Sequence, residues 1–310
     1  MLLPPHALTR SGCGPRVYLE QNVTVRIGTV IGRVIWTVIS VVALVVALAV
    51  LVRAIEPSFA FFPLAGETTT PAQFGVRYEA IAIHTRDGEQ LRAWWLHADA
   101  PRAGIVYFHG NGGNLSVWAP IVAGIAERGY SVVAIDYRGY GSSSGRPSER
   151  GLYRDVDAVL EHVARHHDIH VPLVYWGRSL GATMAAYAAT IARPDGLILE
   201  SGFPDARTLV RSSPPLAFLA LFSTYRFPTA ELVNRAASPV LVLHGDRDSV
   251  IPFALGRALF ERISGPKEFV TVRGGDHNDI TPRDSSRYWD AIDRFIVRVN
   301  SETALPRRTE

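Results

Sequence analysis

The sequence predicts an α/β fold: a mostly parallel, eight-stranded sheet with helices on both faces, preceded by one transmembrane helix. Two observations predict it. An uncharged apolar tract lies near the N-terminus, and strand-like runs then alternate with helical runs through most of the chain. Alternation of this kind is typical of a parallel sheet whose crossovers are helices. The 310 residues, 47% of them hydrophobic, are enough to build a sizeable core.

The apolar tract covers residues 34–52 and is bracketed by Arg33 and Arg53. At about 1.5 Å per residue it spans close to the roughly 30 Å hydrocarbon core of a bilayer. The alternative is a cleaved signal peptide, whose apolar region is usually only about 7 to 15 residues long. The charged flank from Arg53 to Glu56 is also a poor cleavage site. We therefore predict an uncleaved anchor.

Charges beside the tract predict its orientation. Residues 1–33 carry four arginines against one acid, Glu20, whereas the stretch after the tract begins with Arg53 and then has no basic residue for many positions. Basic residues favour the cytoplasmic side. Residues 1–33 are thus expected to be a cytoplasmic arm, and the rest of the protein is expected to face the periplasm, the cell exterior or a lumen.

A linker is predicted over 53–77, the folded domain over 78–300 and a tail over 301–310. The turn Arg86-Asp87-Gly88 predicts that the first two strands form an antiparallel hairpin at the sheet edge. Strands are expected near 78–84, 91–97, 103–108, 130–135, 171–176, 196–200, 239–244 and 267–272. Helices are expected near 115–127, 149–165, 180–192, 253–263 and 284–299.

Residues 202–237 interrupt the alternation and contain several prolines and the apolar stretch Leu216 to Phe222. An insertion of this length between strands is often functional, so we predict a small cap over the site. The alternative is a helix packed on the core, because seven consecutive apolar residues suit either arrangement.

Two segments match the pattern Gly-x-Ser-x-Gly. Residues 177–181 lie between an apolar run and a helical run of small residues, and such a strand–turn–helix setting exposes the serine hydroxyl on a strained bend. The glycines are needed because a Cβ would collide at so sharp a turn. Residues 141–145 instead follow a turn, and Pro147 lies just beyond them. They are predicted to be a loop, and Ser179 is predicted to be the nucleophile.

Acidic and basic candidates follow the later strands. Asp246 and Asp248 come after the strand at 239–244, and His277 comes after the strand at 267–272. Because the carboxyl ends of parallel strands meet at one sheet edge, these side chains are expected near Ser179. Glu200 is a further candidate acid. His109 is a second candidate base, but bracing the loop around it is the role we expect.

Four motifs in this order resemble the α/β-hydrolase superfamily of serine hydrolases over about 78–300. They are His109-Gly-Asn-Gly-Gly-Asn114, the Ser179 turn, His244-Gly-Asp-Arg-Asp248 and Gly275-Asp-His277. With the anchor, the chain resembles membrane-tethered members, several of which act on lysophospholipids, monoacylglycerols or protein thioesters. Prolyl-aminopeptidase-like serine peptidases share the same signatures. The resemblance implies that Asp248, rather than Asp246, is the triad acid.

The expected mechanism is acyl transfer. His277 takes the proton of Ser179, Asp248 orients the imidazole, and the backbone N–H groups of Asn111 and Leu180 bind the oxyanion. The sequence therefore predicts a membrane-anchored serine hydrolase of carboxylic esters or thioesters with lipid-like acyl chains. The alternatives are a peptidase that holds an amine with cap acids, and a non-catalytic binding protein on the same fold.

No cofactor or metal is predicted. His166, His167 and His170 form a histidine cluster, but they follow a helix C-terminus, where positive charge is favourable. The single cysteine, Cys13, excludes an intrachain disulfide. The net charge is only +3, with scattered arginines, so a nucleic-acid partner is not expected.

Overall fold

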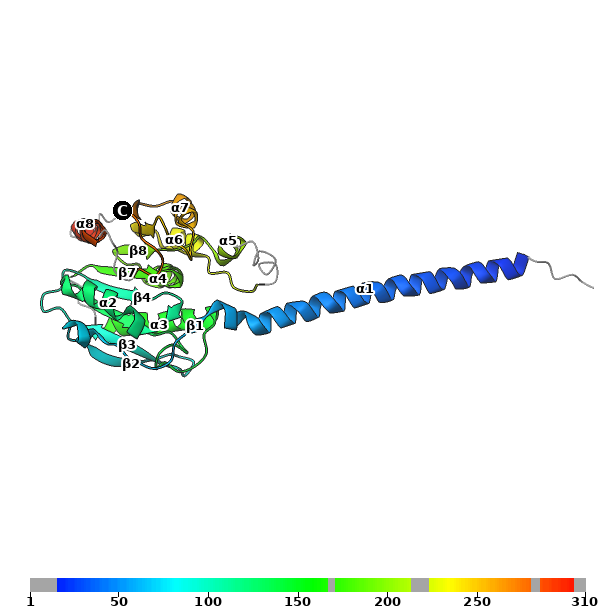
Figure 1. The fold of residues 1–310 in the computed structure, drawn as a ribbon, viewed down its shortest axis with the longest axis horizontal. Coiled ribbons are helices and arrows are strands. Elements are labelled where there is room, and N and C mark those ends of the chain that lie inside the picture. The colour runs from blue at the N-terminus through cyan, green and yellow to red at the C-terminus, as the bar shows by residue number, and fades with distance from the viewer. Residues whose placement is uncertain (1–15, 167–170, 213–222, 280–284, 304–310) are drawn as a thin grey trace, which may run out of the picture. The chain divides into compact units, whose positions relative to one another are not determined.

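The computed structural model describes residues 16–166, 171–212, 223–279 and 285–303. The chain divides into two compact units, Met1–Ala54 and Ile55–Glu310. Helix α1 (Arg16–Ala60) accounts for the described part of the first unit (Figure 1). Its stretch Val30–Ser58 is long and apolar enough to cross a membrane. This stretch contains the predicted span and extends beyond it at both ends.

The second unit is built on an eight-stranded sheet, as predicted. The strand order is β10-β9-β8-β7-β4-β6-β3-β2, and neighbours are parallel except that β3 is antiparallel to β6 and to β2. Each strand lies within two residues of its predicted bounds. The strands are β2 (Glu79–His84), β3 (Gln90–Leu96), β4 (Gly104–Phe108), β6 (Ser131–Ile135), β7 (Leu173–Arg178), β8 (Gly196–Glu200), β9 (Val240–Gly245) and β10 (Lys267–Val272).

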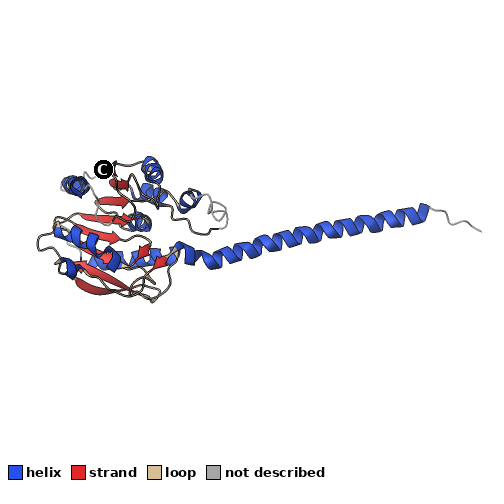
Figure 2. Cartoon of the chain, in the orientation of Figure 1, coloured by secondary structure: helices blue, strands red, loops and turns tan. Residues whose placement is uncertain are grey.

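Helices cover both faces of the sheet (Figure 2). One hydrophobic cluster joins α3 (Glu149–His166), α4 (Leu180–Ile191), α6 (Thr229–Ala236) and α7 (Phe253–Arg262) to one face. The other joins α2 (Leu115–Glu127) and α8 (Ser285–Thr303) to the opposite face. Every residue of β4, β8 and β9 is buried, because a parallel strand covered on both faces has no solvent side.

The first two long strands form the predicted edge hairpin. Strand β2 pairs antiparallel with β3 from Glu79 opposite Trp95 to His84 opposite Gln90. The turn between them is closed by a 2.9 Å hydrogen bond from the Thr85 N–H to the Glu89 carbonyl.

The prediction of a linker at 53–77 missed regular structure. Strand β1 (Phe62–Pro63) pairs in parallel with β5 (Gly112–Gly113), and Pro71–Phe74 form a 3-10 helix, η1. Glu67 lies 2.8 Å from the Arg92 guanidinium. The segment is rich in proline, threonine and glycine. These residues are common both in turns on a domain surface and in free linkers, so composition alone does not separate the two.

The predicted cap is described only in part, and its apolar stretch Leu216 to Phe222 lies outside the described residues. The described part holds two helices, α5 (Ala206–Arg211) and α6. Helix α6 packs on the core, where the Thr229 hydroxyl lies 2.7 Å from that of Thr183. Both expectations for the apolar stretch, a cap or a helix packed on the core, therefore stay predictions.

Candidate active site

Ser179 lies on a sharp turn between β7 and α4. Its φ of 56° is in the left-handed region, which a residue with a Cβ adopts only under strain. The turn leaves no room for side chains at its two glycines. A Cβ added at Gly177 would lie 1.9 Å from the Gly181 carbonyl oxygen, and one added at Gly181 would lie 2.0 Å from the Phe108 carbonyl oxygen. The Ser179 N–H donates to the Glu200 carbonyl at 2.8 Å, which ties the turn to β8.

Asp248 and His277 meet at the carboxyl ends of β9 and β10. The His277 Nδ1 lies 2.8 Å from the Asp248 Oδ2. The other carboxylate oxygen accepts the N–H groups of Val250 at 3.0 Å and Ile251 at 2.6 Å. Burial would raise the pKa of Asp248, but hydrogen bonds from His244 and His277 outweigh it and hold the pKa well below its usual range.

The contact with Asp248 indicates which imidazole nitrogen of His277 carries the proton. An ionised carboxylate can only accept hydrogen bonds. We therefore assign the proton of a neutral His277 to Nδ1, facing Asp248, which leaves the Nε2 lone pair free. This is the form that a general base requires.

The two other carboxylates considered from the sequence have structural contacts. Asp246 Oδ1 accepts the Gly274 N–H at 2.6 Å, as expected of a turn-forming residue. Glu200 lies 3.2 Å from the Arg178 guanidinium and accepts hydrogen bonds from Trp176 and Tyr288. Neither is the partner of His277.

His244 belongs to the same network, which the sequence analysis did not foresee. Its Nε2 lies 3.3 Å from Asp248 Oδ2 and 2.9 Å from the Ile251 carbonyl. The four-residue spacing from His244 to Asp248 could have suggested the contact.

The loop after β4 passes against Ser179. A Cβ added at Gly110 would lie 3.5 Å from the Cβ of Ser179. The next residue, Asn111, is fixed through its side chain, which donates to the Ala60 carbonyl at 2.7 Å and accepts from the Tyr140 hydroxyl at 2.9 Å. Leu180 opens α4, so its N–H has no acceptor within the helix. Both predicted oxyanion residues therefore lie near Ser179. Leu180 follows it in the sequence, and Asn111 follows Gly110, which packs against it.

His109 has the contacts of a bracing residue. The ring is fully buried; its Nδ1 lies 2.6 Å from the Gly110 carbonyl, and its Nε2 lies 3.4 Å from Asp136. The Tyr137 hydroxyl donates to the His109 carbonyl at 3.0 Å. These contacts hold the loop before Asn111, which is the bracing role expected of His109.

Ser179 and His277 are not hydrogen-bonded to each other in the structure. Ser179 is 7% exposed and His277 is 8% exposed. In enzymes without substrate, catalytic hydrogen bonds are often long and shorten only when substrate binds. The structure therefore places His277 in contact with Asp248 and holds Ser179 separately on its strained turn.

No metal site appears among the described residues, where no group of three or more His, Cys, Asp or Glu side chains is arranged to hold an ion. His166 ends α3 with its Nδ1 2.7 Å from the His162 carbonyl, whereas His167 and His170 lie outside the described residues.

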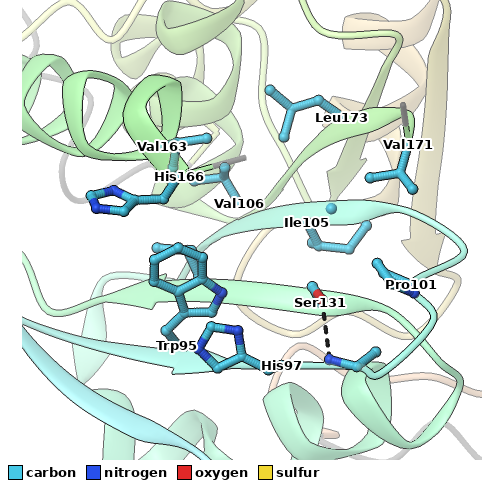
Figure 3. Close-up of a pocket in the computed structure, with 13 residues that line it drawn as sticks. Trp95, His97, Pro101, Ile105, Val106, Ser131, Val163, His166, Val171 and Leu173 are labelled. Atoms are coloured by element: carbon cyan, nitrogen blue, oxygen red, sulfur yellow. Dashed lines mark hydrogen bonds between the residues drawn. The ribbon is translucent and has the colours of Figure 1, made fainter. Parts of the chain in front are cut away.

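A cavity of about 200 Å³ beside His166 is lined by Trp95 and His97 (Figure 3). It lies at the amino ends of β4, β6 and β7, whereas Ser179 lies at the carboxyl end of β7.

Comparisons with known proteins agree with this fold. A family model described as serine aminopeptidase matches residues 99–238, and one described as TAP-like protein matches residues 223–304. An uncharacterised protein of Mycobacterium tuberculosis is 32% identical over 248 residues, which cover 79% of this chain and 87% of the relative. An uncharacterised membrane protein of Saccharomyces cerevisiae is 32% identical over 254 residues, covering 79% and 88%.

Solved structures show the same architecture. An esterase of Pyrococcus furiosus superposes with a TM-score of 0.62 at 18% identity, covering 77% of this chain and 96% of the esterase. The α/β hydrolase GrgF of Penicillium superposes with a TM-score of 0.59 at 17% identity, covering 73% and 100%. Fold, family models and relatives agree, and the chain belongs to the α/β-hydrolase superfamily.

Proposed function

We propose that the protein is a membrane-anchored serine hydrolase that cleaves carboxylic esters or thioesters. The observation that carries the proposal is the 2.8 Å contact between His277 Nδ1 and Asp248, which leaves Nε2 of His277 as the base. The strained Ser179 turn supports it, because such a turn presents a nucleophilic hydroxyl at the end of a strand.

The reaction proceeds in two steps. His277 Nε2 takes the hydroxyl proton as Ser179 Oγ attacks the substrate carbonyl, and Asp248 stabilises the imidazolium that forms. The backbone N–H groups of Asn111 and Leu180 donate hydrogen bonds to the developing oxyanion. His277 then protonates the leaving alcohol or thiol, and water, activated by the same imidazole, releases the acid from the acyl-enzyme.

A lipid-like acyl chain is the substrate we favour. The support is the apolar α1 stretch Val30–Ser58, which would hold the hydrolase unit beside a bilayer where amphiphiles concentrate. In this proposal the N-terminal arm is cytoplasmic and the hydrolase unit lies outside, following the arginine excess in 1–33. Reporter fusions after residue 65 test the topology, and a cytoplasmic signal would reverse it.

The match to a serine aminopeptidase model favours a peptidase as the second candidate function. A peptidase of this kind must hold the substrate ammonium with a free acid. Asp205 caps α5 and lies 3.1 Å from Arg262, and Glu231 lies 3.5 Å from Arg235. Because both carboxylates already have cationic partners, we place ester hydrolysis first.

A substrate panel tests the proposal. Purified full-length protein in detergent micelles is assayed on p-nitrophenyl esters of 2 to 16 carbons, acyl thioesters and aminoacyl anilides, with Ser179→Ala as the blank. We expect Ser179-dependent hydrolysis that favours long acyl chains. Preference for short soluble esters would refute the lipid assignment, preference for anilides would favour the peptidase, and no turnover of any substrate would favour a binding protein.

A further inference from the structure

The side chain of Arg178, the residue before the nucleophile, is turned into the protein. Arg178 is only 2% exposed. A buried guanidinium is costly unless its donors are paired, so its partners define its role. Its Nη1 lies 3.2 Å from the Glu200 carboxylate. Its Nη2 donates to the backbone carbonyl of His277 at 2.6 Å and to that of Asp279 at 3.1 Å.

Glu200 fixes Arg178 from the other side. The carboxylate is 5% exposed and accepts from the Trp176 indole at 3.2 Å and the Tyr288 hydroxyl at 3.1 Å. The Glu200 carbonyl meanwhile accepts the Ser179 N–H at 2.8 Å. One residue of β8 therefore holds the nucleophile through its backbone and the guanidinium through its side chain.

From these contacts we propose that Arg178 is a positioning residue for His277. It connects the nucleophile turn directly to the loop that carries the base, across 99 residues of sequence. The inference rests on the proposed function. Arg178 does not touch substrate; it holds the His277 main chain so that the imidazole can lie between Asp248 and the Ser179 hydroxyl.

The geometry requires arginine specifically. A guanidinium presents five donors in a fixed plane and can bind a carboxylate and two carbonyls at once. The Trp118 ring also lies against it, 5.4 Å from the guanidinium carbon. A lysine ammonium is a point charge on a flexible stem, and we expect it to keep the contact with Glu200 but lose the two carbonyls.

Arg138 offers a matched control in the same domain. It is 5% exposed and its Nε lies 2.8 Å from Asp155, while Nη1 lies 2.9 Å from Asp87. It is thus a second buried arginine held by carboxylates, and its partners Asp155 and Asp87 lie outside the His277 loop.

The test compares Arg178→Lys with Arg138→Lys in the full chain, using an ester that the native protein hydrolyses. We expect both variants to lose some thermal stability. Arg178→Lys should keep KM and lower kcat by about 10- to 100-fold, because small misplacements of a catalytic group cost rates of this order. It should also shift or broaden the low-field proton resonance of the His277 Nδ1–H. Arg138→Lys should keep kcat within about threefold of the native value. It should shift the resonance by less than its line width.

Two results would overturn the inference: native kcat in Arg178→Lys, or an equal fall of kcat in both variants at equal loss of stability. If Arg178→Lys fails to fold, Arg178→Gln, which keeps two amide donors, is compared with Arg138→Gln by the same readouts. Failure of the proposed function is distinguishable, because the native protein would then show no activity that Ser179→Ala abolishes.

Discussion

The two Gly-x-Ser-x-Gly turns of this chain share a pattern and differ in every contact. Ser179 follows β7, has a φ of 56° and leads into α4. Ser143, at the centre of the second turn, lies in a loop after β6, where its hydroxyl donates to the Asp136 carbonyl at 2.8 Å and accepts the Arg92 N–H at 2.8 Å. The Ser144 hydroxyl accepts the Gln90 N–H at 2.9 Å.

The difference lies in what each serine is bonded to, and it is the reason that we propose Ser179 as the nucleophile. The Ser143 hydroxyl is hydrogen-bonded to two backbone groups and joins its loop to β3. The Ser179 backbone is constrained by its neighbours, and the contact between Asp248 and His277 lies at the carboxyl ends of strands of the same sheet. The pattern of five residues is compatible with both roles, and the strand before the turn separates them.

The largest expected contrast is between Ser179→Ala and Ser143→Ala. The first should lower kcat by on the order of 10⁵-fold or more, because loss of a nucleophile removes the acyl-enzyme route. The second should leave kcat within about threefold and cost roughly 1 kcal/mol of stability for its lost hydrogen bonds. Steady-state kinetics and thermal melts measure both. Equal loss of activity in the two variants would end the distinction between the turns.

The next contrast is between Asp248→Asn and Asp246→Asn. Asp248→Asn should lower kcat by on the order of 10³- to 10⁴-fold, because an amide at this position favours the wrong imidazole tautomer. Asp246→Asn should leave kcat nearly native, since that carboxylate only binds the Gly274 N–H. Kinetics on the same ester decide between them, and a larger effect at Asp246 would transfer the acid role to it.

A smaller contrast concerns the last glycine of each turn. Gly181→Ala places a Cβ 2.0 Å from the Phe108 backbone carbonyl, so the sheet must shift and the cost should exceed about 3 kcal/mol. Gly145→Ala meets the Glu89 side chain, which can swing aside, leaving about 1–2 kcal/mol of strain from its positive φ. Urea unfolding measures both changes. Equal costs would show that the Ser179 turn is no tighter than the loop.

The smallest expected effect is on acid stability. The pKa of Asp248 is lower in the folded protein than its ordinary value of 3.8, so its ionised form stabilises the fold. That contribution is fully present above the unfolded-state pKa and is lost as pH falls below it. Asp248→Asn should therefore flatten the loss of stability between about pH 5 and 3 relative to the native protein. An unchanged slope in urea unfolding across that range would argue against a depressed pKa.

Local patterns predicted most of the fold because they reflect burial. Strands β4, β8 and β9 are entirely buried, and the sequence shows them as short apolar runs. The helices that follow them appear as amphipathic stretches. Strand β1 was missed because two residues, Phe62 and Pro63, carry no periodicity. The membrane insertion of α1 and its predicted orientation stay predictions.

The site was predictable only where residues follow strands in order. Asp246, Asp248 and His277 could be placed near Ser179 because they follow β9 and β10, and the resemblance then selected Asp248. The structure confirms its contact with His277. Arg178 was missed because its partner, the His277 carbonyl, is distant in sequence and is a backbone atom that any residue supplies. The catalytic roles themselves stay predictions until they are measured.

Labelling with a fluorophosphonate tests the central claim most directly, because the reagent forms a stable adduct with an activated serine hydroxyl. The full chain is labelled in micelles, digested and mapped by mass spectrometry beside Ser179→Ala and Ser143→Ala. We predict one adduct, on Ser179, that is retained in Ser143→Ala and absent from Ser179→Ala. An adduct on Ser143, or labelling that persists in Ser179→Ala, would contradict the account.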